Sequence, residues 1–419
     1  MSTTYDVLVI GGGASGMMAA IVAAQNGASV LLIEKNKRLG EKLRITGGGR
    51  CNIYNAEQDL KIYLKNYGKA EQFLYSAFTK FGTAETAEFF DSIKLPTKVE
   101  AKNRAFPVTE KAVDVVHALT NKLHRLGVTT LTSTVVTKIN YSDGTIRSVE
   151  CDSNIYKATS YILATGGTSR PETGSTGDGL DWLRTLGHDV KTPTPTITPL
   201  AIKEPWVAKL AGVTAKSVTI TFYANEKRTF KLTGDILFTH FGISGPLILN
   251  NAYKVGDMLD TGAKITATID CVPGMDIKAL DANVIQSLNA DGIKQLKNVL
   301  STFVPAGLNP AIKEILKHEI NFEQKASEVN KQTRKLIVEN LKDLPLTVNK
   351  LMGFEKAVVA DGGINLKDID TRTMQSKKIA NLYITGDLLD INRPSGGYSL
   401  QLCWTTGYVA GLEAAKKHD

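Results

Sequence analysis

The feature that most constrains the fold is a glycine-rich turn near the start of the chain, between an apolar strand and a helix. Val7 to Ile10 form a short apolar run typical of buried parallel strands, and Gly11-x-Gly13-x-x-Gly16 follows it directly. In such a unit Gly11 permits the tight turn, Gly13 lets the backbone approach a pyrophosphate, and Gly16 lets the helix pack closely on its strand. The pattern predicts a βαβ unit that binds a dinucleotide.

An acidic residue at the end of the second predicted strand supports this interpretation. Glu34 lies 23 residues after Gly11. A carboxylate at this place can accept hydrogen bonds from both hydroxyl groups of an adenosine ribose, whereas it would repel a 2′-phosphate. The free amide groups of the intervening helix would face the phosphates. The alternative is a glycine-rich loop without a ligand, and it requires strand, helix and acid to coincide by chance.

Residues 7–24 carry no charge, which also fits a membrane helix or a signal peptide. Asp6 directly precedes them, four glycines and Ser15 interrupt their first half, and no basic segment comes before them. These details argue against both alternatives, so we expect a cytoplasmic protein. With 419 residues the chain is too long for one ordinary domain, and we expect two or three.

The positions of the cysteines and the net charge indicate which cofactors and partners the protein could have. The four cysteines are far apart and form neither a CxxC pair nor a metal-ligand spacing with a histidine; they are Cys51, Cys151, Cys271 and Cys403. This argues against a zinc site, a disulfide scaffold and the flavin reductases that use a redox disulfide, and we expect no metal. The net charge of +8 favours a polyanionic partner, although many basic enzymes have none.

A second glycine-rich segment follows the predicted βαβ unit. Residues 35–52 contain three consecutive glycines, Gly47 to Gly49, and six basic residues against one acid. Such a loop can wrap closely around a phosphate-bearing ligand. Beyond it, the pattern predicts helices at about 69–94 and 109–126, the second one capped by Thr109. Strands at about 128–141 and 145–151 read as a hairpin with an Asp-Gly turn.

The composition changes twice in the remainder of the chain. Prolines near 193–199 precede a region of strand-like alternation at about 200–272, and helical patterns follow at about 276–342. Glycine-rich buried strands return near 355, and a last helix spans about 397–416. We therefore predict one discontinuous nucleotide-binding domain, residues 1–192 and 355–419. A β-barrel-like domain, 193–275, and a helical subdomain, 276–354, would be inserted into it.

The C-terminal segment favours FAD over a nicotinamide alone. Gly386 and Asp387 follow a predicted strand, and a glycine turn, Ser395 to Ser399, opens the last helix. An aspartate at this place can hold ribityl hydroxyls, and a helix N-terminus favours negative charge on a reduced isoalloxazine. Gly-Asp before a helix is equally compatible with a simple cap.

Several longer strings resemble one family of bacterial flavoproteins. The chain is similar to the BaiN/RdsA-like, or aminoacetone-oxidase-like, NAD(P)/FAD-dependent oxidoreductases over nearly its whole length. The strings that carry the resemblance are Ile10-Gly-Gly-Gly-Ala-Ser-Gly16, Thr46-Gly-Gly-Gly-Arg-Cys-Asn52, Ala164-Thr-Gly-Gly-Thr-Ser169 with Gly174-Ser-Thr-Gly177, Leu237-Phe-Thr-His-Phe-Gly-Ile-Ser-Gly-Pro246, and Gly396-Gly-Tyr-Ser-Leu-Gln401.

The resemblance implies a fold and a chemistry. It implies an α/β protein with a discontinuous Rossmann-like FAD-binding domain, an inserted β-barrel-like domain and a helical subdomain. It also implies reduction of conjugated C=C bonds, of steroid-like enones in one branch and of a uridine of large-subunit ribosomal RNA in another. Three positions depart from the family pattern: Asp387 stands in place of a usual Glu, Ser399 in place of a usual Asn, and Asn103 in place of a glycine before Arg104.

Candidate site residues follow from the glycine segments and the resemblance together. The expected cofactors are FAD and, as reductant, NAD(P)H. The candidate cofactor-binding residues are Gly11, Gly13, Ala14, Ser15, Gly16, Glu34, Lys35, Lys42, Gly48, Gly49, Arg50, Cys51, Asn52, Val135, Thr165, Gly166, Gly386, Asp387, Gly397, Tyr398 and Ser399.

Saturation of a C=C bond requires an acid that protonates the carbon adjacent to the hydride acceptor. Cys51, whose thiol the neighbouring Arg50 could tune, and His240 in the inserted segment are the candidates. An inert buried thiol and a structural histidine are the respective alternatives. We expect Tyr398 to pack on the flavin and Arg50 to bind phosphate.

The distribution of charge suggests a substrate. Residues 294–356 hold 11 Lys/Arg against 7 Asp/Glu, which favours an rRNA uridine and its reduction to dihydrouridine, although a solvated helical face would look the same. The candidate RNA contacts are Lys331, Arg334 and Lys335, with Arg104 or Tyr398 stacking on the extruded base. Alternatives are a small-molecule enone reductase, an amine-type oxidase, and a non-catalytic RNA-binding flavoprotein.

Overall fold

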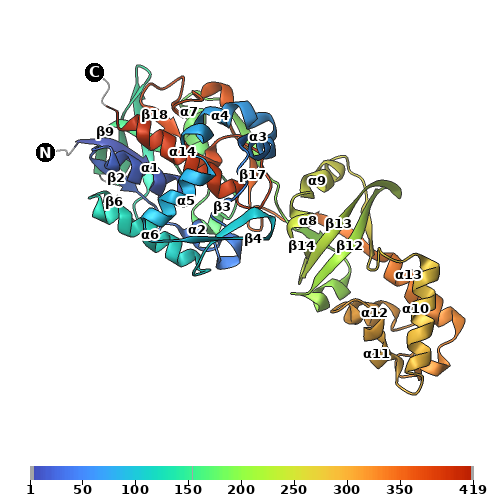
Figure 1. The fold of residues 1–419 in the computed structure, drawn as a ribbon. Helices are drawn as coiled ribbons and strands as arrows, with labels where there is room; N and C mark the ends of the chain where they lie inside the picture. Colours follow the sequence, from blue (N-terminus) through green and yellow to red (C-terminus); the bar gives the residue numbers. More distant parts are fainter. Residues whose placement is uncertain (1–3, 153, 417–419) are drawn as a thin grey trace. The chain divides into compact units, whose positions relative to one another are not determined.

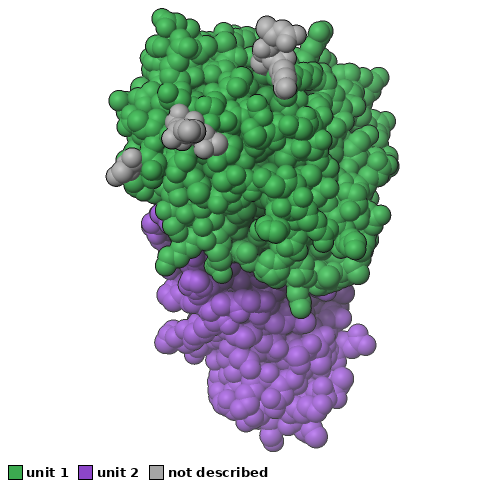
Figure 2. Space-filling view, turned by 90° about the vertical axis from the view of Figure 1, so that its left-hand side faces the viewer, with its two compact units in different colours: residues 1–195, 357–419 green, residues 196–356 purple. Residues whose placement is uncertain are grey.

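The computed structural model describes residues 4–152 and 154–416 (Figure 1). The chain forms two compact units (Figure 2). Unit 1 contains the residues up to Pro195 and those from Ala357 onward, and unit 2 is Thr196–Lys356. In the described part of the chain, no helix has the length and apolar character that a membrane crossing needs.

A mostly parallel sheet forms the centre of unit 1. The strand β1 pairs in parallel with β2 and β9, so that Ile10 lies between Ile33 and Leu163. The far half of β9 also pairs in parallel with β18, while its start forms an antiparallel hairpin with β8. The strands, in sheet order, are β6 (Thr129–Leu131), β2 (Val30–Ile33), β1 (Thr4–Ile10), β9 (Asn154–Leu163), β8 (Thr145–Cys151) and β7 (Val136–Ser142), with β18 (Leu382–Ile384) on β9.

Two buried helices from opposite ends of the sequence pack against each other. They are α1 (Ala14–Gln25) and α14 (Tyr398–Ala414). A Cβ atom added at Gly407 would lie 2.4 Å from the Ser15 carbonyl oxygen, and one added at Gly411 would lie 2.3 Å from that of Ala19. These glycines therefore permit the close contact, which places the start of α14 beside the glycine turn that opens α1.

The predicted helical segments of unit 1 are present, with one difference in detail. The helical patterns expected at about 69–94 correspond to α4 (Glu71–Lys80) and α5 (Thr83–Ser92), which separate at Gly82. The helix expected from Thr109 is α6 (Ala112–Arg125), and Lys111, without a side-chain cap, precedes it. Thr109 therefore does not cap a helix.

The predicted hairpin is present as β7 and β8, but the residues before it belong elsewhere. Thr129–Leu131 forms the separate strand β6, which pairs in parallel with β2. A small antiparallel sheet covers part of unit 1; its strands are β3 (Tyr54–Asn55), β5 (Arg104–Pro107) and β4 (Thr97–Glu100). Further elements of unit 1 are α2 (Glu41–Arg44), α3 (Leu60–Leu64), α7 (Asp178–Thr185), β10 (Val190–Pro195) and β17 (Ala360–Ile364).

Unit 2 consists of a closed barrel and a group of helices. Alternate residues of β12 point inward and are fully buried, among them Val218, Ile220 and Phe222. The barrel strands, in order around it, are β11 (Leu200–Ile202), β14 (Gly242–Ser244), β13 (Lys227–Thr239), β12 (Thr214–Ala224), β15 (Ile265–Asp270) and β16 (Leu344–Leu351). The short helices α8 (Pro246–Leu249) and α9 (Ala252–Asp260) lie against the barrel.

The remaining helices lie together at one end of unit 2 (Figure 1). They are α10 (Ile277–Ala290), α11 (Leu296–Val299), α12 (Asn309–Leu316) and α13 (Lys331–Lys342). The expected helical subdomain extended to residue 354, but the helices end at Lys342, and β16 closes the barrel between β15 and β11. The predicted α/β fold with an inserted barrel and helices is confirmed.

Candidate cofactor-binding site

A cleft in unit 1 lies where the parallel strands end. It encloses about 1150 Å³ of space, part of which is open to solvent. Ile10 at the end of β1, Ile33 at the end of β2 and Ala164 after β9 contribute to its wall. The carboxyl ends of parallel strands are the usual position of nucleotide sites in α/β folds.

The glycine turn shapes one wall of the cleft. Gly11 has a φ of 105°, and a Cβ atom at this position would lie 2.5 Å from the Ala164 carbonyl oxygen. A Cβ atom at Gly16 would lie 1.8 Å from the Gly11 oxygen, whereas one at Gly13 has no atom within 4 Å. Gly11 and Gly16 therefore serve the packing of strand and helix, and Gly13 leaves space in the cleft. Because no side chain caps α1 at Gly13, the first amide groups of this helix are available to an anion.

Glu34 is held rigidly at the wall of the same cleft. Its Oε2 accepts a hydrogen bond from the Gly12 amide at 2.7 Å, and its Oε1 accepts one from the Asn36 amide at 2.8 Å. The residue is only 7% exposed. Each carboxylate oxygen has a further lone pair, so the group can still accept hydrogen bonds from ribose hydroxyls.

Lys35, another predicted cofactor ligand, lines the cleft but is already paired. Its Nζ lies 2.7 Å from Asp178 Oδ2 and 2.5 Å from the Thr176 hydroxyl. Burial alone would raise the pKa of Asp178, but the hydrogen bonds from Lys35 and Thr176 outweigh it and hold this pKa below its usual value. The ion pair fixes α7 to the end of β2, beside Glu34.

Lys42 and Asp387, which line the cleft, form a compact group of charges with Arg393. Lys42 Nζ donates to Ser169 Oγ at 2.7 Å and lies 3.3 Å from Asp387 Oδ2. The guanidinium group of Arg393 donates to Asp387 Oδ1. Burial alone would raise the pKa of Asp387, but the positive charges of Arg393 and Lys42 hold it below its usual value. Asp387 therefore faces the cleft as a carboxylate.

Sequence reasoning missed Arg393. This residue is 2% exposed, and its Nη1 donates to the Ile391 carbonyl at 2.6 Å while its Nε donates to Ser399 Oγ at 3.2 Å. The available signal was its position, a single basic residue between the two predicted ligands Asp387 and Ser399.

The structure brings together about half of the predicted cofactor-binding residues. Those that line the cleft are Gly11, Gly13, Ala14, Ser15, Glu34, Lys35, Lys42, Val135, Thr165, Gly166, Asp387 and Ser399. Those that do not are Gly16, Gly48, Gly49, Arg50, Cys51, Asn52, Gly386, Gly397 and Tyr398. Among the lining residues that the sequence did not indicate are Asn36, Leu43, Thr46, Ser175, Trp182, Leu400 and Cys403. Thr165 also has a buried hydroxyl with no hydrogen-bond partner in the described part of the chain.

Arg50 does not have a free charge for a phosphate. Its guanidinium group lies 2.5 Å from Glu100 and 3.3 Å from Glu110, and its Cζ lies 4.1 Å from the centre of the Phe106 ring. The expectation that Arg50 binds phosphate stays a prediction, and it would require this guanidinium group to leave or share its two carboxylate partners. Gly48 and Gly49 before it are exposed, have positive φ values of 67° and 87°, and leave open space around their Cα atoms.

Cys51 does not fit the role of a proton donor. Its side chain is fully buried and does not line the cleft. Burial raises the pKa of its thiol to about 12. The idea that Arg50 activates this thiol is also wrong, because the Arg50 charge is directed to Glu100 and Glu110.

Asn52 and Asn55 connect the first glycine-rich segments to the last one. In the amide orientation that satisfies its neighbours, Asn52 donates to the Tyr54 and Ala105 carbonyls and accepts from the Gly397 amide, all at 3.0–3.1 Å. Asn55 donates to the Gly396 carbonyl at 3.1 Å. Asn52 thus positions the turn before α14 and is not directed at the cleft.

Tyr398 packs among other aromatic residues. Its ring centre lies 5.0 Å from that of Tyr63 and 6.2 Å from that of Tyr67, whose hydroxyl donates to the Tyr398 carbonyl. Arg104, the other candidate for stacking, donates from Nε to the Ala101 carbonyl, and its Cζ lies 5.8 Å from the Phe106 ring centre.

The remaining candidates lie in unit 2. His240 is exposed in the turn between β13 and β14, and its ring packs edge-on against Phe241 at 4.9 Å. Arg334 forms an ion pair with Asp281 at 2.6 Å, and Lys335 lies 3.5 Å from Glu339. In all, six of the eleven basic residues at 294–356 are in ion pairs: Lys294, Lys297, Lys317, Arg334, Lys335 and Lys342. The described residues hold no group of three or more His, Cys, Asp or Glu that could bind a metal.

Comparisons with known proteins match the chain along its whole length. The profile of the HI0933-like protein Rossmann domain matches residues 5–413. The 3-dehydro-bile acid delta(4,6)-reductase of Clostridium scindens is 31% identical over 412 residues, which cover 98% of each chain. The ribosomal RNA dihydrouridine synthase of Escherichia coli is 25% identical over 417 residues, which cover 98% of this chain and 99% of the synthase.

Among solved structures, the 3-ketosteroid-delta4-(5alpha)-dehydrogenase of Rhodococcus jostii has a similar fold. The TM-score is 0.54, with 15% sequence identity, and the match covers 100% of this chain and 98% of the dehydrogenase. At this level of identity the match supports the fold.

Proposed function

Because the chain belongs to the family of HI0933-like proteins with a Rossmann domain, we propose that it reduces a C=C bond conjugated to a carbonyl group, with bound FAD and with NAD(P)H as the reductant. Family membership makes the protein a flavin-type oxidoreductase. The observation that carries the finer proposal is the chemistry common to two full-length relatives. A delta(4,6)-reductase acts on double bonds, and dihydrouridine is uridine with one double bond saturated.

The cleft has the groups that FAD requires. Glu34 would accept hydrogen bonds from the adenosine ribose, and the first amide groups of α1 would bind the pyrophosphate across the open space at Gly13. The carboxylate of Asp387 and the unpartnered hydroxyl of Thr165 would form hydrogen bonds with the ribityl chain. When bound, the flavin supplies the hydride for the double bond.

The proton for the second carbon requires a different group. The buried Cys51 is unsuited, so we propose His240 as the acid, with its exposed imidazole able to exchange protons with solvent. His240→Gln is expected to leave FAD content and NAD(P)H oxidation by an artificial acceptor intact while reducing enone turnover at least about tenfold. Equal turnover in the variant would mean that another group, or water, donates the proton.

For the substrate we favour a small conjugated ketone. The ion pairs at 294–356 compensate more than half of the basic side chains that had suggested RNA, and the relative with the higher identity is a bile acid reductase. A uridine of large-subunit rRNA is the second candidate, which the net charge of +8 and the dihydrouridine synthases support. None of these relatives supports an amine-type oxidase. A non-catalytic RNA-binding role is disfavoured because these full-length relatives are enzymes.

Anaerobic stopped-flow absorbance of the full-length protein can separate these candidates. NAD(P)H should bleach the flavin, and a 3-keto-4-ene steroid should then restore its absorbance faster than a ribosomal RNA transcript does. If only the transcript restores the absorbance, with a two-hydrogen mass gain at a uridine, the second candidate is correct. If neither restores it under these conditions, the proposed C=C reduction is wrong for both classes.

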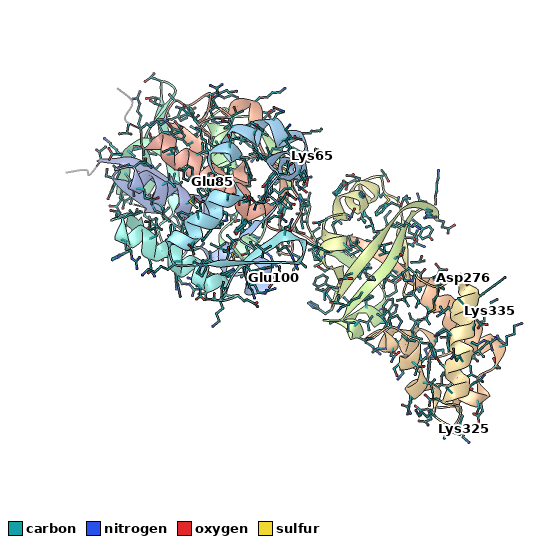
Figure 3. All side chains as sticks on the ribbon, in the orientation of Figure 1. Lys65, Glu85, Glu100, Asp276, Lys325 and Lys335 are labelled. Carbon is teal, nitrogen blue, oxygen red and sulfur yellow. The ribbon has the colours of Figure 1, made fainter. Side chains whose placement is uncertain are left out.

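Charge reversal tests the RNA alternative directly. Lys331 and Lys335 are exposed on α13, whereas Arg334 is engaged with Asp281 and its reversal would also disturb packing. The variant to test is therefore Lys331→Glu with Lys335→Glu, and Lys65→Glu in unit 1 is a control with the same charge change at each substituted site (Figure 3). A reduced salt dependence of RNA binding in the α13 variant alone would support a phosphate-binding face.

A further inference from the structure

Asp387 and Ser399, near the C-terminus, share one buried partner, Arg393. Asp387 and Ser399 both line the cleft, and Arg393 contacts both from behind the wall without lining the cleft itself. Its side chain is only 1% exposed. A buried guanidinium group is costly unless acceptors compensate it, and here a carboxylate, a hydroxyl and the Ile391 carbonyl do so.

The charges around this contact do not cancel. Lys42 and Arg393 bring two positive charges to one carboxylate, Asp387, which lines the same cleft as Glu34. A dinucleotide with its adenosine ribose at Glu34 and its pyrophosphate at Gly13 would have its flavin half in the remainder of the cleft, whose wall includes Asp387 and Ser399. A net positive charge in a poorly solvated wall stabilises a negatively charged cofactor.

We propose that Arg393 is a positioning residue of the cofactor site: it holds Asp387 and Ser399 in the wall and supplies the excess positive charge that favours the reduced, anionic form of the cofactor. This inference rests on the proposed binding of FAD. A purely structural role, in which Arg393 only fastens the loop through the Ile391 carbonyl, would predict a loss of stability without a correlated change in redox behaviour.

The midpoint potential of the bound flavin distinguishes the two roles. The potential would be measured by dye equilibration in wild type and variants, at a pH where carboxylates are ionised and without any substrate. Arg393→Gln removes a positive charge and should lower the potential, whereas Asp387→Asn removes a negative charge and should raise it. Arg393→Lys should return the potential toward that of wild type. Arg393→Gln should also weaken FAD binding by about ten- to a hundred-fold.

Glu413→Gln provides the matched control. Glu413 is a poorly exposed carboxylate of unit 1 that pairs with Lys80 and does not line the cleft. If the potentials of Arg393→Gln and Asp387→Asn equal that of this control, or shift in the same direction, the inference is overturned. If Arg393→Gln does not fold, the other two variants test the inference. An unchanged midpoint potential in Asp387→Asn together with an unchanged FAD affinity in Ser399→Ala would also overturn it. Absence of FAD in the wild type would instead refute the proposed function.

Discussion

Pro195 and Ala360 are partners in the antiparallel pair of β10 and β17, although the whole of unit 2 lies between them in the sequence. The ends of unit 1 at the insertion point are thus adjacent, and a short turn can join them. We predict that replacing residues 196–356 by a two-residue Asn-Gly link leaves a folded, yellow protein that does not reduce the enone. Absorbance and thermal unfolding check this outcome.

A deletion protein that is folded but colourless would show that unit 2 contributes to FAD binding. A matched deletion that also removes β17 should fail to fold, because β10 then loses its pairing partner.

The open space at Gly13 leads to a second prediction. Gly13→Val should abolish FAD binding. The unfolding free energy of the FAD-free protein should stay within about 1 kcal/mol of wild type, because the added side chain would project into the open space of the cleft. Gly16→Val should instead prevent folding, since its Cβ would overlap the Gly11 oxygen. Gly274→Val, in the open on unit 2, is the neutral control. Full FAD occupancy in Gly13→Val would place the cofactor elsewhere.

The third prediction concerns Cys51. Its buried thiol, with a pKa raised to about 12, should resist alkylation at pH 7.5 in the native protein and react only after denaturation. Cys51→Ala should cost about 1–2 kcal/mol of unfolding free energy and leave the turnover number within about threefold of wild type. Rapid labelling of Cys51, identified by peptide mass spectrometry, would contradict its inert character.

His188 should make the stability of unit 1 depend on pH. It is buried, its Nε2 lies 2.7 Å from the Ser376 hydroxyl, and burial lowers its pKa below the usual value. The unfolded chain therefore binds the proton more readily than the folded chain. Stability is full above about pH 6.5 and falls as the pH decreases from there toward the lowered folded pKa.

Thermal unfolding at pH 7.5 and 5.5 measures this effect. His188→Gln should be less stable at pH 7.5 but should lose less on acidification than wild type does. His117→Gln, at an exposed position of α6, should keep the wild-type pH dependence. If His188→Gln and His117→Gln lose stability equally on acidification, the pH dependence comes from other groups.

The sequence predicted those parts of the site that depend on local geometry. Gly11, Gly16 and Glu34 act within one continuous βαβ unit, so their spacing alone places them. The ion pairs of Arg50 with Glu100 and Glu110, and of Arg393 with Asp387, depend instead on how loops fold over one another. A basic residue near glycines looks the same in sequence whether it meets a phosphate or a carboxylate, so the pairing of Arg50 with Glu100 and Glu110 could not be predicted.

Local sequence patterns also explain which elements of the fold could be predicted and which could not. The buried strands β1, β9 and β18 are apolar enough to be recognised, and the composition changes on entering the barrel. The strand β16 follows directly on α13, and its alternation is short, so its return to the barrel could not be read from the pattern. The helical patterns expected at about 69–94 did not locate the break at Gly82, where α4 and α5 separate.

The link between Asn52 and Gly397 also has a consequence for biosynthesis. Glu34 and the glycine turn at Gly11 are synthesised well before Asp387, Arg393 and Gly397, which lie much further along the chain. Until these residues are released, α1 has no partner in α14, and one wall of the cleft does not exist. The complete cleft therefore requires both segments, and a nascent chain truncated before Gly386 would carry the nucleotide fingerprint without Asp387, Ser399 and Cys403 in the cleft wall.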